Sequence, residues 1–470
     1  MSGLYSSINA SVRALSAQSR ALEIAGKNLA NVNNPGYARQ RVIFGDRGSV
    51  LTPDGAESLG LEALGIEQLR DTLLDRQVMR EIGMKSSYQA EQTANQRAQT
   101  ALGQSIDRSS GASATNANAG NGIAGAIDDF FNAFQSFAAS PTDDGQRQLL
   151  LQKASILSER FQLADQRLAQ VQGDVNTQID SDVGQVNGLL ASIAELNGQI
   201  GRAELNNPGS AVDLRDQRQA KIELLSAKLP VELHDSTNGQ VQVVAKDATG
   251  ADVVLVDLVS VVGGVTFNGT QLSGGSPVTP LALNAGAIKG SLTARDGSIQ
   301  TLRNDLDQLA RQLVTSVNLA YNPSGATGNF FSPAGLAAGT IALVGGLTPG
   351  TLKASDGGAA GDNTLALAVA QLATKVFSTG AGNSIDGTFS GAFGKTVSKL
   401  GQALAGASAR VEDQSKIEQL VRGQRDAVSG VSLDEEMADL LKFQRSFQAS
   451  SRVFSVMDDL LDGVVNRLGR

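Results

Sequence analysis

The sequence of 470 residues contains no cysteine, no tryptophan and one histidine, His234. Without cysteine, disulfides, thiol catalysis and cysteine zinc sites are excluded. A single histidine also excludes multi-histidine metal and active sites, and a Ser-His-Asp triad would have to use His234. His234 follows an apolar run and precedes Asp235, which is typical of the end of a strand. We therefore predict no catalytic residue, no metal site and no cofactor.

Aromatic residues and positive charge are also scarce. Only 4 % of residues are aromatic, and 39 basic against 47 acidic side chains leave a net charge of −8. Such a chain is a poor match for nucleic acid or an anionic membrane, so we expect neither as a partner. The most apolar stretch, residues 251–265, is too short to span a bilayer and contains Asp252 and Asp257.

Two further patterns are weak signs of chemistry. Gly394-Lys395-Thr396 resembles the end of a phosphate-binding loop, but Phe389 stands where that motif requires its first glycine. Adjacent acids occur at residues 128–129, 434–436 and 458–459. Neighbours on a helix point about 100° apart and do not converge as an acid–base pair. We therefore expect that the protein is not an enzyme.

The amino-terminal end is predicted to form a helix of about 30 residues with a narrow apolar seam. The seam repeats every seven residues and consists of Ile8, Leu15, Leu22 and Leu29. The helix is expected to stop at Asn34-Pro35-Gly36-Tyr37, because a proline forces the residue before it out of the α region and glycine allows a turn. We interpret these four residues as the bend between the terminal helix and the body.

The carboxyl-terminal end carries a stronger seam. Ser432 and Glu435 have the spacing of a capping box, which predicts the start of a helix. The seam then consists of Leu440, Phe443, Phe447, Phe454, Met457, Leu461 and Leu468. The simplest partner for one terminal seam is the other, in a parallel or antiparallel pair. The alternative is that each seam packs on its own domain core.

Between the termini, long helices surround a β-rich stretch. Residues 149–205 contain no proline and keep near-heptad apolar spacing, which predicts one helix with at most one break, near Gly184 or Gly188. Helices are also predicted at residues 212–229, 302–320, 364–376 and 395–429. Residues 231–283 contain β-branched runs between Gly and Asn turns, which predicts strands.

This order predicts a mainly α, elongated fold with an inserted small β domain, a terminal coiled coil and a long-helix bundle as its body. We predict a terminal coiled coil from residues 1–40 and 430–470. The helical body takes residues 41–230 and 291–429, with a Gly/Ala-rich, β-containing segment near 322–363, and the β domain takes 231–290. Because each terminal helix alone buries too little to offset its ordering entropy, we expect this coiled coil to be disordered in the monomer.

Several runs resemble the axial proteins of the bacterial flagellum. The first is Asn28-Leu29-Ala30-Asn31-Val32-Asn33-Asn34-Pro35-Gly36-Tyr37. A second, Val428-Ser429-Gly430-Val431-Ser432-Leu433-Asp434-Glu435-Glu436-Met437 with residues 441–450 after it, is similar to the hook-associated proteins of the hook–filament junction. Pro141 with Arg147 and residues 213–218, 306–310 and 361–363 agree with that family.

The resemblance implies a structural role in a ring between hook and filament, with terminal helices lining the tube and the middle facing outward. Expected partners are copies of the chain itself, the hook protein on one side and a second junction protein or the filament on the other. An export chaperone is expected on the carboxyl-terminal helix. The family is exported unfolded through the flagellar type III apparatus to the extracellular flagellum. The first residues, which lack the features of a cleaved Sec signal, agree with that route.

Three other functions stay open. A flagellin-like filament subunit would share the terminal coiled coil and would polymerise into long filaments. An adhesin would bind a surface ligand through residues 231–290 alone, and a wall hydrolase would need converging acids. The junction role predicts that Phe447→Asp or Phe454→Asp leaves a soluble monomer unable to join the ring.

Overall fold

The structure is a computed structural model that describes residues 2–34, 36–46, 48–52, 55–58, 60–103, 122–326, 328–359 and 361–463. It contains two compact units. Unit 1 consists of Met1–Lys85, Asp182–Gly286 and Asp413–Arg470. Unit 2 consists of Ser86–Ser181 and Ala287–Glu412. The fold is mainly α with a small inserted β region, as predicted.

Unit 1 begins with the predicted amino-terminal helix, α1 (Ser2–Ala30). Residues 41–68, which the sequence analysis assigned to the helical body, contain strands that pair in two antiparallel pairs. Their strands are β1 (Gln40–Asp46), β2 (Ser49–Thr52), β3 (Gly55–Ser58) and β4 (Leu61–Gln68). β1 pairs with β4 and β2 with β3, both antiparallel. The side chains of β1 and β4 are mostly half-buried and alternate weakly, so the period-2 signal of a strand is faint.

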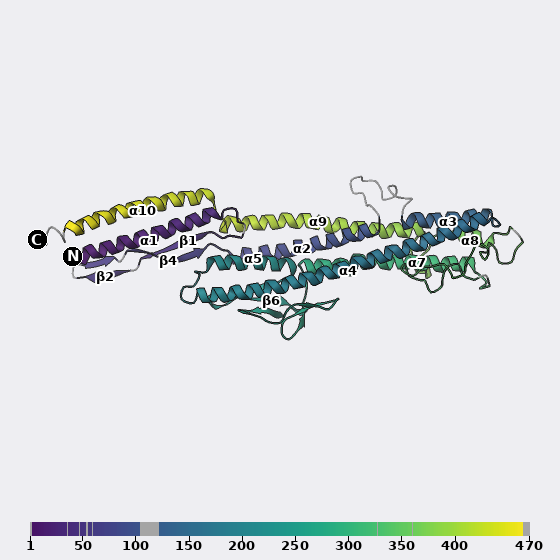
Figure 1. The fold of residues 1–470 in the computed structure, drawn as a ribbon, viewed down its shortest axis with the longest axis horizontal. Coiled ribbons are helices and arrows are strands. Elements are labelled where there is room, and N and C mark those ends of the chain that lie inside the picture. The colour runs from purple at the N-terminus through teal and green to yellow at the C-terminus, as the bar shows by residue number, and fades with distance from the viewer. Residues whose placement is uncertain are drawn as a thin grey trace. The chain divides into compact units, whose positions relative to one another are not determined.

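The β1–β4 hairpin packs on α1 (Figure 1). Gly60 lies just before β4 at a φ of 83°, which favours glycine. A Cβ at Gly60 would come within 3.0 Å of the Ala10 side chain. A side chain at this position would therefore push the hairpin away from the helix.

The carboxyl-terminal helices are α9 (Phe389–Ser429) and α10 (Leu433–Asp462). α10 lies beside α1 and runs antiparallel to it, with the N and C labels at the same end of the pair (Figure 1). Of the two orientations open at the sequence level, the structure has the antiparallel one.

The rest of unit 1 combines helical segments with small sheets. α5 (Val212–Lys228) is complete in it, whereas α2 (Thr72–Ala101) and α4 (Asp144–Ala203) each contribute one part. The larger sheet is antiparallel in the order β5 (Glu232–Asp235), β6 (Val241–Lys246), β7 (Asp252–Asp257) and β8 (Ser260–Val261). The smaller sheet has β10 (Leu272–Gly274) between β9 (Thr266–Phe267) and β11 (Thr279–Pro280). A 3₁₀ turn occupies Thr237–Gly239.

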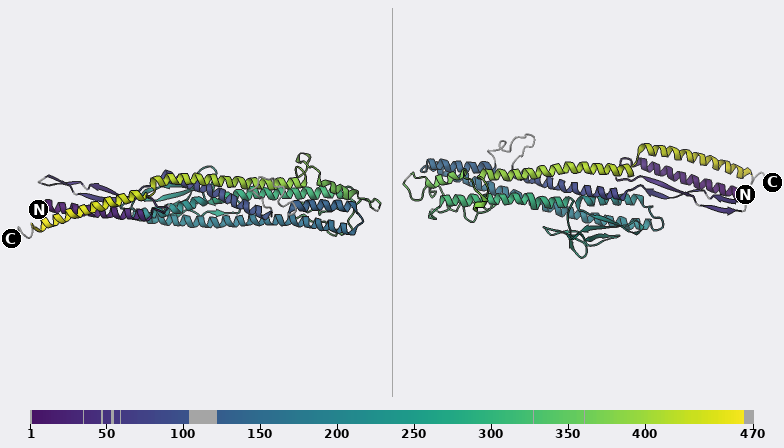
Figure 2. Two further views of the ribbon diagram at one scale, coloured as in Figure 1. Left: turned by 90° about the horizontal axis from the view of Figure 1, so that it is seen from above. Right: turned by 180° about the vertical axis from the view of Figure 1, so that it is seen from behind.

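Two asparagine side chains of α4 form hydrogen bonds with the backbone of these strands. Asn197 donates to the carbonyls of Val241 and Leu258, at 2.7 Å each. Asn187 donates to the carbonyl of Val265 and accepts from its N–H. The strands gather beside this part of α4 (Figure 2). Side-chain amides thus satisfy backbone groups that a sheet of this size leaves unpaired.

α4 is one uninterrupted helix of 60 residues. Its predicted stripe is buried in full: Leu157, Phe161, Ala164, Leu168, Val171, Val175, Ile179, Val183, Val186, Leu190, Ile193 and Ile200. Neither Gly184 nor Gly188 breaks the helix, because the apolar stripe on either side of them is packed.

Unit 2 contains α3 (Ile123–Ala139), α6 (Ala287–Thr293), a π-helical turn (Ala294–Ile299), α7 (Gln300–Tyr321) and α8 (Thr364–Ala370). Short 3₁₀ turns follow at Gln371–Ala373 and Thr379–Ala381. Among the described residues of 322–363, β structure is limited to a bridge between Phe331 and Leu343.

The core of unit 2 is a cluster of aromatic rings. Phe130 packs at 5.1–5.9 Å, centroid to centroid, against Phe131, Phe134, Phe330 and Phe331. This cluster anchors a Gly/Ala-rich segment that has little regular structure. Within the described part of the chain, no helix is long and apolar enough to cross a membrane.

Candidate functional site: the terminal helix pair and its polar base

The terminal pair, α1 with α10, is the site to which the sequence points. On α1, the most deeply buried face consists of Ala17, Ala21, Ile24, Ala25 and Asn28. The predicted seam residues Ile8, Leu15, Leu22 and Leu29 are half-buried. Because α1 is covered by the β1–β4 hairpin as well as by α10, its buried face is wider than a two-helix seam and is displaced from the predicted one.

On α10, one side faces the pair and the other is exposed. Leu440, Phe443, Phe454, Met457 and Leu461 are half-buried. The Phe443 ring lies 6.2 Å from that of Phe44 on β1, centroid to centroid. Phe447 is 37 % exposed and, four residues after Phe443 and seven before Phe454, lies on the same side of the helix as both. Leu468 lies outside the described residues.

The exposed side of α10 carries six large apolar side chains that are 49–58 % exposed, and we call them the outer stripe: Leu433, Met437, Leu441, Val453, Val456 and Leu460. They form two groups, one in the first turns of the helix and one near its end, with the polar residues Arg445 and Gln448 between them. Exposed apolar surface on a soluble protein marks a candidate site of interaction.

Asn28 is the centre of a buried polar cluster at the base of the pair. Its Nδ2 donates to the carbonyl of Gln40 at 2.8 Å and to Oε2 of Glu436 at 3.0 Å. Its Oδ1 accepts from the Tyr37 hydroxyl at 2.8 Å and from the Gln40 N–H at 3.0 Å. One amide therefore joins α1, the chain entering β1, and α10.

Arg39 meets three carboxylates of α10. Its Nε lies 2.6 Å from Oε1 of Glu436, its Nη1 2.6 Å from Glu435, and its Nη2 3.4 Å from Asp439. Burial alone would lower the pKa of Arg39, but the facing carboxylates of Glu436 and Glu435 outweigh it and raise the pKa. The guanidinium thus stays charged and holds the first turn of α10.

The predicted capping box begins α10 at the right residue, but its two side-chain hydrogen bonds do not form. Ser432 is the residue before α10, but its hydroxyl makes no capping hydrogen bond. Glu435, expected to bond back to the cap, accepts from Arg39 instead. The Arg39 guanidinium carries a full positive charge, which attracts the Glu435 carboxylate more strongly than a neutral backbone N–H does, and this explains the exchange.

The predicted bend contains turn bonds at the end of α1. The Asn34 side chain accepts from the N–H of Gly36 at 3.3 Å, and its carbonyl accepts from the N–H of Tyr37 at 3.1 Å. Pro35 lies outside the described residues. Burial raises the pKa of the Tyr37 hydroxyl, and nearby carboxylates, Asp216 first among them, raise it further, so it stays protonated as a donor.

The run at residues 213–218 anchors this base from α5. Asp213 accepts from the Gln40 side chain at 3.2 Å. Asp216 accepts from Arg70 at 2.5 Å. Burial raises the pKa of Asp216, although the Arg70 guanidinium opposes the shift. These acids therefore hold both ends of the β1–β4 segment.

The arginines of the same run point to other elements. Arg215 makes a two-pronged bond to Glu204, which follows α4, at 2.7 and 2.6 Å. Arg218 donates to Asn197 at 2.8 Å and to the carbonyl of Gly239 at 2.7 Å. Burial, together with the neighbouring charge of Arg215, lowers the pKa of Arg218 to about 10. α5 is thus the common anchor for the terminal strands, α4 and the β5–β8 sheet.

Replacing Glu204 by glutamine should lower the melting temperature of unit 1 at neutral pH and change it little in acid. Burial raises the pKa of Glu204, but Arg215 and backbone donors outweigh it and lower the pKa below its usual value. The stabilisation is therefore present above the unfolded pKa of about 4.3 and is lost as the pH falls through the folded value. At pH 7 the expected loss is about 1.5–3 kcal/mol.

Calorimetric scans at pH 7 and pH 3.5 would test this. Glu195→Gln, an exposed acid of the same helix, is the control and should shift neither scan. An equal loss for Glu204→Gln at both pH values would contradict the mechanism.

Sequence reasoning did not select the polar residues of this base as site residues. They are Asn28, Arg39, Gln40, Asp213, Asp216 and Glu436. Asn28 and Glu436 lie in the two runs that resemble flagellar proteins, and Asn28 also continues the spacing of the small residues Ala17, Ala21 and Ala25 along α1. For Asp213 and Asp216, the only signal was that their run resembled the flagellar family.

Three family models match the chain. "Flagellar hook-associated protein FlgK helical domain" matches residues 113–330. "Flagella basal body rod protein" matches residues 8–37, and "Flagellar basal body rod FlgEFG protein C-terminal" matches residues 424–468. The two terminal matches therefore fall on α1 with its turn and on α10.

Curated relatives give the same name. Flagellar hook-associated protein 1 of Bacillus subtilis is 25 % identical over 524 residues, which cover 100 % of this chain and 99 % of the relative. That of Salmonella typhimurium is 27 % identical, covering 70 % of this chain and 60 % of the relative. That of Escherichia coli is 26 % identical, covering 67 % of this chain and 57 % of the relative. The match thus spans nearly all of one relative and less than two thirds of the other two.

Among solved structures, the flagellar hook junction protein FlgK from Burkholderia pseudomallei aligns with a TM-score of 0.45 and 23 % identity, covering 55 % of this chain and 46 % of that one. This likeness is too low to carry an argument. With the helical-domain match, the two terminal matches and a relative aligned over all of this chain, we recognise the protein as a homologue of the flagellar hook-associated proteins 1.

Proposed function

We propose that this protein is a structural subunit of the junction between flagellar hook and filament, and that it joins copies of itself through the terminal pair. Its homologues are structural flagellar proteins, so it assembles with other axial components and is part of the flagellum. The observation that supports the terminal pair as the joint is the outer stripe of α10.

The outer stripe favours association with another helix. Its six residues lie in two groups along α10 and are 49–58 % exposed. Full burial of one such side chain is worth about 1.5–3 kcal/mol relative to exposure, so several together can offset the cost of ordering and association. The covered side of α10 is already occupied by α1 and β1. A second subunit would therefore meet the outer stripe.

The polar base supports the same role in another way. Asn28 and Arg39 fix where α10 leaves the body, through bonds to the first turn of the helix. A fixed exit presents the outer stripe in one direction, which a repeating assembly requires. In the proposed ring, the hook protein lies on one side and a second junction protein or the filament on the other.

Before assembly, we propose that an export chaperone covers α10. An amphipathic helix with regularly spaced apolar residues suits capture in a groove. The protein would then leave the cell unfolded through the flagellar type III apparatus, without a cleaved signal, and its terminal helices would become fully ordered in the ring. The three-part domain division and the assembly seam remain predictions of this proposal.

Immunogold electron microscopy of the source cells would test the proposal, using antibodies raised against the whole chain. We expect label at one narrow band between hook and filament. Label along the filament would favour the filament-subunit alternative, and label on the cell surface away from flagella would favour the adhesin. Either of those outcomes would overturn the junction role.

A further inference from the structure

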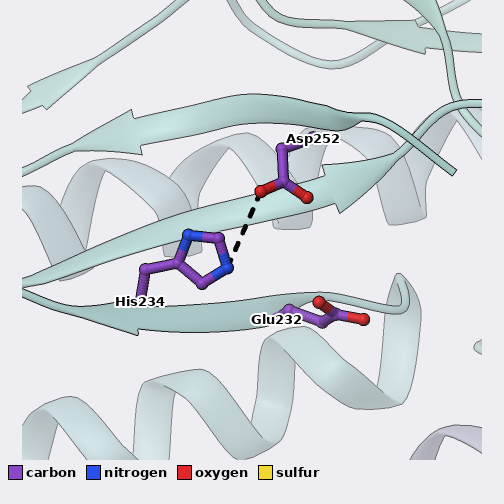
Figure 3. A group of neighbouring side chains, drawn as sticks. All are labelled: Glu232, His234 and Asp252. Carbon is purple, nitrogen blue, oxygen red and sulfur yellow. Dashed lines mark ion pairs between the residues drawn. The ribbon is translucent and has the colours of Figure 1, made fainter.

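We propose that Glu232, His234 and Asp252 form a binding site for a divalent transition-metal ion, with Zn²⁺ as the representative ligand. One donor atom of each residue lies within 4.8 Å of the others. Figure 3 shows His234 and Asp252 turned toward each other over the β5–β7 part of the sheet, with Glu232 beside them. This site lies outside the terminal pair and does not depend on the flagellar role.

The register of the sheet explains why these side chains converge. Glu232 and His234 are two residues apart on β5, so both point to the same face. Asp252 opens β7 and pairs with Lys246 of β6, while Val244 of β6 pairs with Glu232. A β-bulge between Val243 and Val244 strengthens the local twist and brings the ends of β5 and β7 toward each other.

A positive charge already occupies the centre of this cluster. The Lys246 ammonium lies 3.3 Å from Oε2 of Glu232 and forms a closer ion pair with Asp252. The two carboxylates therefore converge on a position that accepts a cation. Because Lys246 is a flexible, strongly hydrated point charge, it can swing out to solvent when a metal ion takes its place.

The donor set matches zinc rather than calcium or magnesium. His234 Nε2 lies 3.7 Å from Oδ2 of Asp252, and zinc bonds of about 2.0–2.2 Å need only a small rotation to bring both atoms into one coordination sphere. An imidazole with two carboxylates is a ligand set of zinc and related metals, whereas calcium and magnesium prefer oxygen alone. The sequence analysis expected no metal site because it considered only His and Cys clusters. Here the ligands are mixed, and they come from β5 and β7, which β6 separates in the sheet.

The composition makes this site testable in the full chain. The protein contains no cysteine and no histidine other than His234, so it offers no other imidazole or thiol ligand for zinc. Titration calorimetry with ZnCl₂ at pH 7.5 should show one class of site, with a stoichiometry of one. The NMR signals of a labelled histidine, which come from His234 alone, should shift at the same zinc concentrations.

Variants separate this site from adventitious binding. His234→Ala and Asp252→Asn should each weaken zinc binding about tenfold or more, because both remove a ligand. Asp257→Asn, an exposed acid at the other end of β7 that bonds Gln242, should leave the affinity unchanged. Lys246→Met should tighten binding, since the competing ammonium is gone.

Two results would overturn the proposal. One is an unchanged histidine spectrum at saturating ZnCl₂. The other is equal zinc affinity in the wild-type chain and His234→Ala. A Lys246→Met variant that binds zinc no better than the wild type would show that the ammonium does not occupy the metal position.

Discussion

Replacing Glu436 by alanine should detach the first turn of α10 from α1 and destabilise unit 1 by about 2–3 kcal/mol. Glu436 is only 2 % exposed and joins the half-buried Arg39 guanidinium to the buried Asn28 amide. Removing it leaves Arg39 with only the more exposed carboxylates of Glu435 and Asp439, and leaves the Asn28 amide without one of its acceptors. The expected loss is therefore mainly the cost of a buried donor that has lost its acceptor.

Glu435→Ala is the matched control for this prediction. Glu435 lies at the same 2.6 Å from Arg39, but its side chain is 63 % exposed, so the expected loss is about 0–1 kcal/mol. Hydrogen exchange of the full chain would show faster exchange in α10 and the end of α1 for Glu436→Ala only. Similar exchange for the two variants would mean that burial does not decide the strength of this junction.

The helices were predictable from the sequence because their signal is local and repeated. The stripe on α4 recurs over many turns, and each of its predicted residues is buried. The strands at residues 40–68 were not predictable in the same way. Their apolar residues are few and half-buried, so neither the helical period of 3.6 residues nor the strand period of 2 is evident in the sequence.

The polar base could not be predicted because its bonds join distant parts of the chain. Asn28 and Glu436 are 408 positions apart, and no local pattern shows that they meet. The predicted capping box failed for the same reason. Its spacing was correct, but Glu435 accepts a hydrogen bond from Arg39 instead of from the cap. Only the folded chain brings Arg39 near this residue. Burial decides which polar residues must form hydrogen bonds inside the protein, and burial depends on the whole fold.

The shift of the buried face on α1 has a similar cause. A seam deduced from heptad spacing assumes one partner, whereas α1 packs against α10 and a hairpin together. Small residues such as Ala17 and Ala21 then become the most buried ones, because they let both neighbours approach closely. The larger residues Leu15 and Leu22 lie at the border of that face.

Phe447 and Phe454 are seven residues apart and lie on the covered side of α10, so Phe447→Asp or Phe454→Asp would weaken the pairing with α1 inside one molecule. Leu441 is part of the outer stripe and is 52 % exposed. Leu441→Asp therefore places its charge on a surface that the monomer leaves exposed.

Leu441→Asp should therefore leave the monomer as stable as the wild type and prevent its incorporation at the junction. Burying an unpaired carboxylate between subunits costs several kcal/mol, which removes at least about a hundredfold in association. The monomer is measured by its melting temperature, which should change little, and incorporation by gold label between hook and filament, which should disappear.

Gln448→Asp is the control, because it adds the same charge two turns further along the same face of α10, where the wild-type side chain is exposed and polar. It should be incorporated normally. If Leu441→Asp is incorporated as well, the outer stripe is not the surface between subunits, even where the junction role itself stands. If neither variant is incorporated, added charge anywhere on this face blocks assembly, and its apolar residues have no special role. Only loss confined to Leu441→Asp supports apolar contact between subunits along the outer stripe of α10.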